Sequence, residues 1–312
     1  MQNFEKINHE IEKKFRAILP DIDGKKRLHL SWSNWGFGRE SLEKSLRRLS
    51  ANGIEYVELH GNRYGDDIGY DAKEVKKIAD GEGVSVAGIC GMFSAENDLS
   101  SVSGIQRQNA IDYIRRNLEL GAFLGIKYML IVPGAVGRPV PYDGFEFHRS
   151  VETLQKTAPF FQQAKVRGAV EPIRSEEVSF CHTFKEAKKY IEAVNHPWID
   201  KINGDIFHML TGETHIAETI LDYGDYLTNI HMADTNRMAL GRGMMDLDTI
   251  LKALYITGYN NEDCFCTPEP LGPGGDPYPA MHGIQDPKAL DLMVSETAQY
   301  FRNRESAILS TS

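Results

Sequence analysis

The sequence predicts a single-domain (β/α)8 barrel, and three observations support this fold class. Short apolar, β-branched segments alternate with longer amphipathic segments through residues 27–302. The alternation repeats eight times, which is typical of a closed parallel barrel. No low-complexity linker divides the chain. An open doubly wound sheet is the alternative. No G-x-G-x-x-G motif follows the first strand, which argues against the dinucleotide-binding form of that fold.

The predicted strands end in polar or functional residues. They cover residues 28–33, 54–60, 84–90, 126–132, 168–173, 199–204, 227–232 and 263–270. The third and fourth show the clearest strand pattern, whereas the sixth and eighth depend partly on their spacing between helices.

The predicted helices show leucine or other apolar residues three or four positions apart. They cover residues 40–51, 71–80, 105–124, 147–166, 183–194, 213–223, 246–256 and 286–302. Asp71, Ser103 and Thr183 are capping residues at helix starts, and Gly53 and Gly125 mark helix exits. We expect residues 1–26 to form a helical extension that packs on the barrel, and residues 303–312 to form a C-terminal tail.

Charge and cysteine content limit the classes of partner. The 312 residues carry a formal net charge of -9, which argues against nucleic-acid and anionic-membrane partners. The charged N-terminus has no signal-peptide core, and no apolar run approaches the roughly 20 residues that span a bilayer. The four cysteines form no CxxC pair, so we expect reduced thiols in a cytoplasmic protein.

Four consecutive predicted strands each deliver a metal-ligand type to the catalytic end of the barrel. These residues are Glu171, Asp205, His231 and Glu269. Strand ends converge in a barrel, so three carboxylates and an imidazole would surround one point. Converging buried carboxylates repel, and a divalent cation removes the conflict. Oxygen-rich ligation with one imidazole favours Mn2+ or Mg2+, with Co2+ as a further option and Zn2+ less expected.

Two longer motifs carry a family resemblance. The segments 205-DIFH-208 and 231-HMADTNR-237, together with Glu171 and Glu269, resemble the xylose isomerase-like barrel superfamily. Ketose 3-epimerases and the isomerases and dehydratases of inositol catabolism, such as inosose dehydratase, are the members nearest in style. The resemblance implies that the four residues named above hold the metal and that the two glutamates move the proton. It also implies that Glu177, His208 and Arg237 bind substrate oxygens.

Three further residues are candidates for substrate contact. Trp35 follows the first predicted strand, and its ring would pack against a sugar, with barrel core as the equal alternative. Glu58 lies near the end of the second strand and would face the pocket. His148 follows the loop 133–147 after the fourth strand, and a surface helix position is its favoured interpretation.

The predicted site supports three reactions of a sugar carbonyl. Proton removal next to the carbonyl through a metal-stabilised enediolate leads to epimerisation, isomerisation or elimination. The long segments 133–147 and 269–283 depart from ordinary ketose epimerases, and the segment 269–283 resembles the α subunits of C-glycoside deglycosidases. Those subunits use Mn2+ and a small β subunit. We expect a sugar or sugar-conjugate substrate and a homo-oligomer, with a small second subunit in the deglycosidase case. An apurinic endonuclease and a non-catalytic barrel are the alternatives from other classes.

Overall fold

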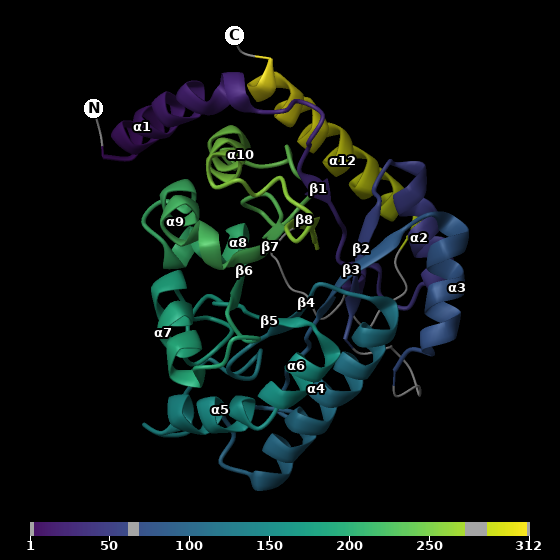
Figure 1. The fold of residues 1–312 in the computed structure, drawn as a ribbon, viewed down its shortest axis with the longest axis vertical. Helices are drawn as coiled ribbons and strands as arrows, with labels where there is room; N and C mark the ends of the chain where they lie inside the picture. The colour runs from purple at the N-terminus through teal and green to yellow at the C-terminus, as the bar shows by residue number, and fades with distance from the viewer. Residues whose placement is uncertain (1–2, 62–68, 272–285, 311–312) are drawn as a thin grey trace.

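A computed structural model describes residues 3–61, 69–271 and 286–310, and its centre is an eight-stranded parallel sheet. The strands pair in the order β1-β8-β7-β6-β5-β4-β3-β2 (Figure 1). An additional parallel bridge joins Ser33 to Glu58, so the chain after β1 contacts β2 and brings the sheet round into a barrel. The predicted (β/α)8 barrel is therefore confirmed. Its strands are β1 His29–Leu30, β2 Tyr56–His60, β3 Ser85–Cys90, β4 Tyr128–Ile131, β5 Arg167–Val170, β6 Lys201–Asp205, β7 Leu227–Met232 and β8 Phe265–Pro268.

The helices surround this barrel. They are α1 Asn3–Ile18, α2 Leu42–Ala51, α3 Ala72–Glu82, α4 Gly104–Leu124, α5 Glu146–Gln155, α6 Ala158–Ala164, α7 Phe184–Val194, α8 Ile206–Gly212, α9 Ile216–Tyr223, α10 Leu247–Ile256 and α12 Pro287–Leu309. Within the described ranges, no helix is both long enough and apolar enough to cross a membrane.

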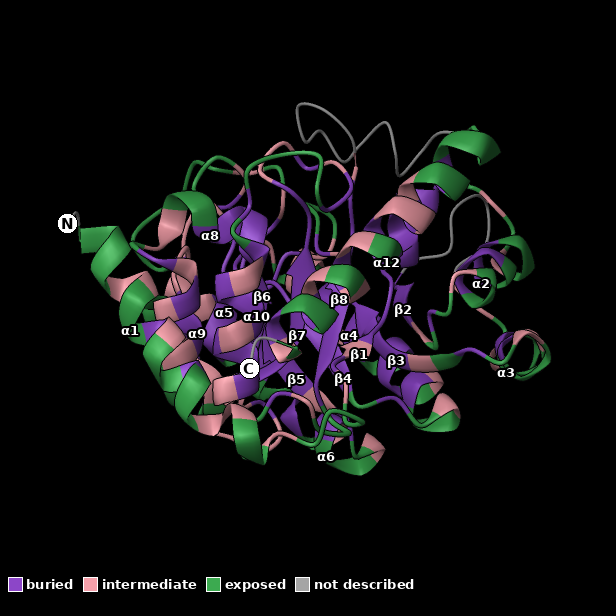
Figure 2. Ribbon diagram, turned by 90° about the horizontal axis from the view of Figure 1, so that it is seen from above, coloured by how far each residue is buried: buried purple, intermediate pink, exposed green. Residues whose placement is uncertain are grey.

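The strands are buried on both faces, because side chains fill the barrel interior and helices cover its outside. All four residues of β4 and all six of β7 are buried. Figure 2 shows the strands as the mostly buried centre, with exposed residues mainly on the outer sides of the helices and in loops. Continuous apolar runs such as 128-YMLI-131 are typical of parallel strands in this setting.

Two helical regions differ from the prediction. The helix expected over residues 147–166 is two helices, because Pro159 stands at the start of α6. A proline inside a continuous helix would lack an N–H donor and clash with the preceding turn. The short helix α8 was not predicted. It begins directly after β6, where the Asp205 side chain accepts a hydrogen bond from Phe207 N.

The last helix is longer than predicted, which corrects the tail assigned to residues 303–312. Helix α12 continues through Leu309 because Phe301 and Ile308 are buried and Glu305 is fully enclosed. The Glu305 carboxylate accepts hydrogen bonds from Leu28 N and Tyr255 Oη, both at 2.8 Å. These contacts tie the end of the chain to the start of β1 and to α10.

The N-terminal extension is the helix α1, which packs against α9 and α10 (Figure 1). Ile11 and Phe15 supply its buried face. His215 joins the two parts, because its Nε2 lies 2.8 Å from Asn8 Oδ1 while its Nδ1 accepts a hydrogen bond from Glu218 N and so caps α9. This pattern requires a neutral imidazole with the hydrogen on Nε2.

We expect His215 to make folding stability depend on pH. Burial lowers the pKa of His215. The unfolded chain therefore takes up a proton at a higher pH than the folded chain, and this contribution to stability is lost as pH falls through about 6.5 and below. His215→Asn keeps a capping side chain without titrating. The Tm of the wild type should fall more steeply than that of the variant between pH 8 and pH 5, and parallel curves would contradict the prediction.

Candidate metal centre and active site

The four predicted metal ligands lie at the carboxyl ends of four neighbouring strands. Glu171 directly follows β5, Asp205 is the last residue of β6, His231 lies near the end of β7, and Glu269 directly follows β8. Backbone hydrogen bonds from Glu171 N to Ile131 O and from Glu269 N to Met232 O continue the sheet to these positions. All four residues are at most 5% exposed.

Distances between side-chain atoms show that the four residues share one centre. His231 Nδ1 lies 3.3 Å from Glu171 Oε1 and 3.3 Å from Glu269 Oε2. Asp205, His231 and Glu269 each offer a ligand atom within 4.8 Å of the others, and Glu171, Asp205 and His208 form a second such trio. The structure therefore brings together all the residues that the sequence proposed as metal ligands, with His208 beside them.

One oxygen of Asp205 indicates that this centre fits a cation. Asp205 Oδ2 is buried and accepts no hydrogen bond from the described residues, although His208 Nε2 lies 3.2 Å away. A buried carboxylate oxygen without a partner is costly. A divalent cation held by Glu171, Asp205, His231 and Glu269 would satisfy it, and three carboxylates with one imidazole form a suitable donor set.

The electrostatics of the centre lead to the same conclusion. Burial, with Glu269 as a second cause, raises the pKa of Asp205 to about 7, and burial also raises the pKa of Glu171 and of Glu269. Burial alone would lower the pKa of His231, but Glu269 and Glu58 hold it well above its usual value. The carboxylates thus favour a positive charge at their centre, which a divalent cation supplies.

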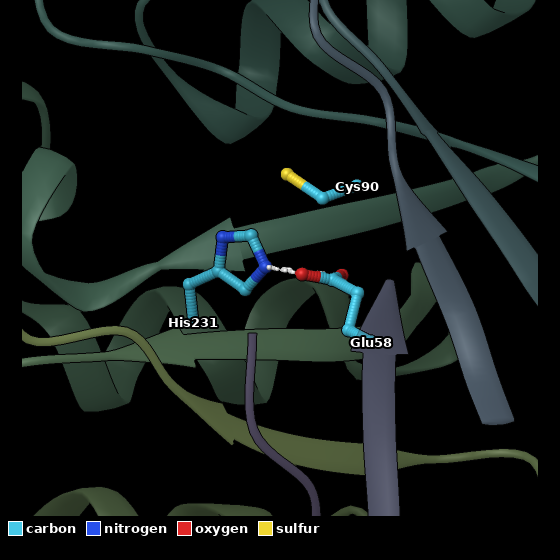
Figure 3. A group of neighbouring side chains, drawn as sticks. All are labelled: Glu58, Cys90 and His231. Carbon is cyan, nitrogen blue, oxygen red and sulfur yellow. Dashed lines mark hydrogen bonds and ion pairs between the residues drawn. The ribbon is translucent and has the colours of Figure 1, made fainter. Parts of the chain in front are cut away.

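Glu58 lies beneath this centre, where it contacts His231. Its Oε1 is 2.9 Å from His231 Nε2, and the two side chains face each other in Figure 3. The Glu58 side chain is fully buried, and its contact with His231 is one that the sequence did not predict. The substrate contact expected for Glu58 stays a prediction.

Arg237 and Glu177 lie beside the carboxylates. Arg237 Nη1 is 3.5 Å from Glu177 Oε1, and Arg237 Nη2 is 3.8 Å from Glu269 Oε1. The sequence analysis missed Arg174, whose Nε donates to Glu177 Oε1 at 2.7 Å. Arg174 and Arg237 both lie over the ring of Phe207, at 4.9 and 4.8 Å from its centroid. The position of Arg174, three residues after Glu171, was the available signal.

The backbone of Arg237 is held in an unusual conformation. Its φ is 59°, in the left-handed region that few non-glycine residues adopt. Arg237 N donates to Asp234 O, and Leu271 N donates to Arg237 O at 2.7 Å. The Asp234 carboxylate in turn accepts hydrogen bonds from the backbone of Gly241 and Met245. This turn fixes the position from which the guanidinium enters the site.

Trp35 and His208 complete the inner surface. Trp35 lies in the 3-10 turn Asn34–Phe37, and its indole Nε1 donates to Glu269 Oε2 at 2.7 Å. Trp35 is therefore both buried and in contact with a candidate catalytic group. For His208, burial lowers the pKa well below its usual value, with Arg237 and Arg174 adding to the effect. Its imidazole is neutral and can donate to a hydroxyl or accept from one.

His148 does not join the site. It is exposed on α5, where its ring contacts Phe147 edge-on. This exposed helix position agrees with the interpretation that the sequence favours for His148, within the helix expected from residue 147.

The structure describes the long loop after β4 but only a small part of the second long segment, 269–283. The loop after β4 is held down by Arg138, which pairs with Asp98 at 3.1 Å and with Glu146 at 2.6 Å. Its exposed apolar residues include Val140 and Phe145. Most of the second segment, residues 272–283, lies outside the described residues.

Comparisons with known sequences identify relatives among sugar epimerases. The chain is 23% identical over 231 residues to a ketose 3-epimerase of Arthrobacter globiformis, covering 73% of this chain and 78% of the relative. It is 24% identical over 246 residues to a 3-dehydro-D-guloside 4-epimerase of Escherichia coli, covering 74% of this chain and 89% of the relative.

Solved structures share the fold. A D-allulose 3-epimerase from Methylomonas sp. in complex with D-allulose matches with a TM-score of 0.76 and 19% identity, covering 89% of this chain and 97% of that one. A D-psicose 3-epimerase with D-tagatose from Clostridium cellulolyticum H10 matches with a TM-score of 0.75 and 24% identity, covering 89% and 99%. The IOLI protein, which holds a zinc atom, matches with a TM-score of 0.68 and 16% identity, covering 91% and 98%.

A family model decides the assignment, because it spans most of the barrel. The model described as "Xylose isomerase-like TIM barrel" matches residues 46–285, which include all four candidate ligands. This match confirms the resemblance that the ligand motifs predicted. The chain belongs to the xylose isomerase-like TIM barrel family.

Proposed function

We propose that this chain is a divalent-metal-dependent carbohydrate epimerase or isomerase that moves a proton beside a sugar ketone. The observation that carries the proposal is the approach of Glu171 and Glu269 to one buried point, each 3.3 Å from His231 Nδ1. Two carboxylates at one centre can serve as base and acid in turn. Relatives named as a ketose 3-epimerase and a 3-dehydro-D-guloside 4-epimerase support this reaction class.

In this proposal the two glutamates act on opposite faces of the substrate. Strands β6 and β7 separate β5 from β8 in the sheet, so Glu171 and Glu269 approach the centre from different directions. One carboxylate takes the proton from the carbon beside the ketone, and the electron pair of the C–H bond moves into the enolate. The other carboxyl returns a proton to the opposite face, which inverts that carbon.

The ligand set defines the cofactor in this proposal. Glu171, Asp205, His231 and Glu269 would hold one divalent cation, Mn2+ by preference, with Mg2+ or Co2+ as alternatives. Such a cation supplies Lewis-acid stabilisation of the negative charge that develops on the substrate oxygens.

Three side chains would orient the substrate next to the glutamates. Arg237 donates hydrogen bonds to a substrate oxygen, and its contact with Glu177 fixes the guanidinium. The neutral imidazole of His208 donates to a hydroxyl or accepts from one. The contacts of His208 with Asp205 and of Arg237 with Glu269 support these roles.

Elimination is the second candidate function. The same proton removal leads to cleavage when the substrate carries a leaving group β to the ketone, as a 3-oxo-C-glycoside does. The loop after β4 supports this alternative, because it is long, ordered by the ion pairs of Arg138 with Asp98 and Glu146, and follows a barrel strand, where such loops are usually functional. A relative is named as a 3-dehydro-D-guloside 4-epimerase, so its named substrate carries a ketone at carbon 3, as a 3-oxo-C-glycoside does.

The experiment is to incubate the Mn2+-loaded protein in D2O with ketohexoses, 3-oxo-O-glycosides and 3-oxo-C-glycosides, and to follow the products by NMR. Epimerisation predicts deuterium at the carbon that inverts, without release of an aglycone. Release of the aglycone would favour elimination instead. Absence of exchange into every substrate would contradict both functions.

A further inference from the structure

Polar side chains fill the barrel interior directly beneath the metal centre. They come from five strands and are completely buried: Glu58, Tyr128, Asn203, Asn229 and Thr267. Bulky branched apolar residues usually dominate such interior layers. Buried polar groups cost stability unless each is hydrogen-bonded, so their presence here requires a reason.

The hydrogen bonds among these residues form one connected network. Thr267 Oγ1 donates to Asn229 Oδ1 at 2.6 Å, and Asn229 Nδ2 donates to Asn203 Oδ1 at 2.7 Å. Asn203 Nδ2 then donates to Glu171 Oε1 at 2.8 Å. The network therefore ends on one of the candidate metal ligands.

A second branch of the network ends on Glu58. Its Oε2 accepts hydrogen bonds from Tyr128 Oη at 2.9 Å and from Asn229 Nδ2 at 3.2 Å. The Tyr128 ring reaches this position because Gly88, its neighbour on β3, has no side chain. A Cβ at Gly88 would lie 2.4 Å from the ring. The local sequence thus makes room for a donor that fixes the Glu58 carboxylate.

Glu58 in turn fixes His231. Both Glu58 oxygens lie close to His231 Nε2, at 2.9 and 3.1 Å (Figure 3). An ionised carboxylate only accepts, so Nε2 carries a hydrogen. Nδ1 faces the point shared with Glu171 and Glu269, where its lone pair would bind a cation. The thiol of Cys90, also drawn in Figure 3, lies beside the pair and contacts Met92 Sδ at 3.7 Å.

We propose that Glu58 is a positioning residue whose buried carboxylate, held by Tyr128 and Asn229, orients His231 so that Nδ1 faces the metal. This inference rests on the proposed function, which makes His231 a metal ligand. Outer hydrogen-bond partners of ligating histidines fix the tautomer and ring orientation, and their loss typically costs about 10- to 100-fold in metal affinity.

Glu58→Gln is the direct test, because an amide cannot satisfy all of these donors at once. If the amide oxygen faces His231, its NH2 group meets the Asn229 donor; if it flips, the NH2 group meets His231 Nε2. Glu305→Gln is a matched control. Glu305 is another fully buried carboxylate that accepts a hydrogen bond from a tyrosine, Tyr255, but it contacts no candidate ligand among the described residues.

Mn2+ affinity is measured by isothermal titration calorimetry, and the Tm of each metal-free protein is recorded. We expect Glu58→Gln to bind Mn2+ at least tenfold more weakly than the wild type. Glu305→Gln should lower the Tm and keep the affinity within twofold. The visible absorption of bound Co2+ should change in Glu58→Gln only, since it reports ligand geometry and not stability.

Tyr128→Phe is the replacement test if Glu58→Gln does not fold, because it removes the hydroxyl that donates to Glu58 and keeps the ring. It should weaken Mn2+ binding about threefold or more and alter the Co2+ spectrum in the same direction. Wild-type affinity and spectrum in either folded variant would overturn the positioning role while the metal site stands. A wild-type protein that binds no divalent metal would overturn the proposed function and the positioning role together.

Discussion

Replacing Glu171 or Glu269 by glutamine is expected to lower the rate of solvent-hydrogen exchange into the substrate by roughly 10²- to 10⁴-fold. Glutamine keeps the size and a ligand oxygen of each side chain but cannot take or return a proton. Both residues lie 3.3 Å from His231 Nδ1, so neither can replace the other without moving. The measurement is deuterium incorporation by NMR with Mn2+ at a saturating concentration for each variant.

Glu176→Gln is the control for this pair. Glu176 is exposed in the loop that also carries Glu177, so its variant should exchange at the wild-type rate. The Tm of each variant separates lost chemistry from lost folding. Full exchange by both Glu171→Gln and Glu269→Gln would show that the proton is moved by other groups.

Asp205→Asn is expected to have the second largest effect, on metal binding itself. Its Oδ2 is buried without a hydrogen bond among the described residues, and the carboxylate lies close to Glu269 and His231. Loss of this charge should weaken Mn2+ binding by at least the ~100-fold that removal of an outer partner can cost. The metal-free variant should have a higher Tm than the metal-free wild type, because one of several repelling buried carboxylates is gone.

Asp200→Asn provides the comparison for Asp205→Asn. Asp200 immediately precedes β6 and pairs with Arg167 at 3.2 Å, so it lies at the opposite end of the same strand. Its variant should keep wild-type Mn2+ affinity in calorimetric titrations. An equal loss of Mn2+ affinity in the two variants would mean that the integrity of β6, and not the Asp205 carboxylate, controls metal binding.

The positions of the four candidate ligands in the fold could be predicted from sequence because a barrel repeats one simple rule. Each strand ends at the same rim, so a residue's place at a strand end fixes its place in space. Glu171 and Glu269 required only that the strands before them be recognised. The depth at which a side chain lies inside the barrel could not be predicted in the same way. Glu58 and His60 alternate onto the same side of β2, but nothing in the alternation shows that Glu58 lies a layer below the pocket.

The missed features depend on interactions between distant parts of the chain. Helix α8 was missed because seven residues after Asp205 are too short for a helical repeat to show. The place of Arg174 in the site could be recognised only from the structure, in which Arg174 and Arg237 both lie over the Phe207 ring. The helix that carries His148 could be predicted from its apolar spacing, and the structure begins it one residue earlier, at Glu146.

The most direct test of the proposed metal-dependent proton transfer combines metal analysis with exchange. Protein purified without chelators is assayed for bound metal, and deuterium entry into ketohexoses and 3-oxo-glycosides is then followed with and without EDTA. We predict one Mn2+ or similar divalent ion per chain and exchange that EDTA abolishes and Mn2+ restores. Exchange at an unchanged rate in metal-free protein, or no metal and no exchange, would contradict the proposal.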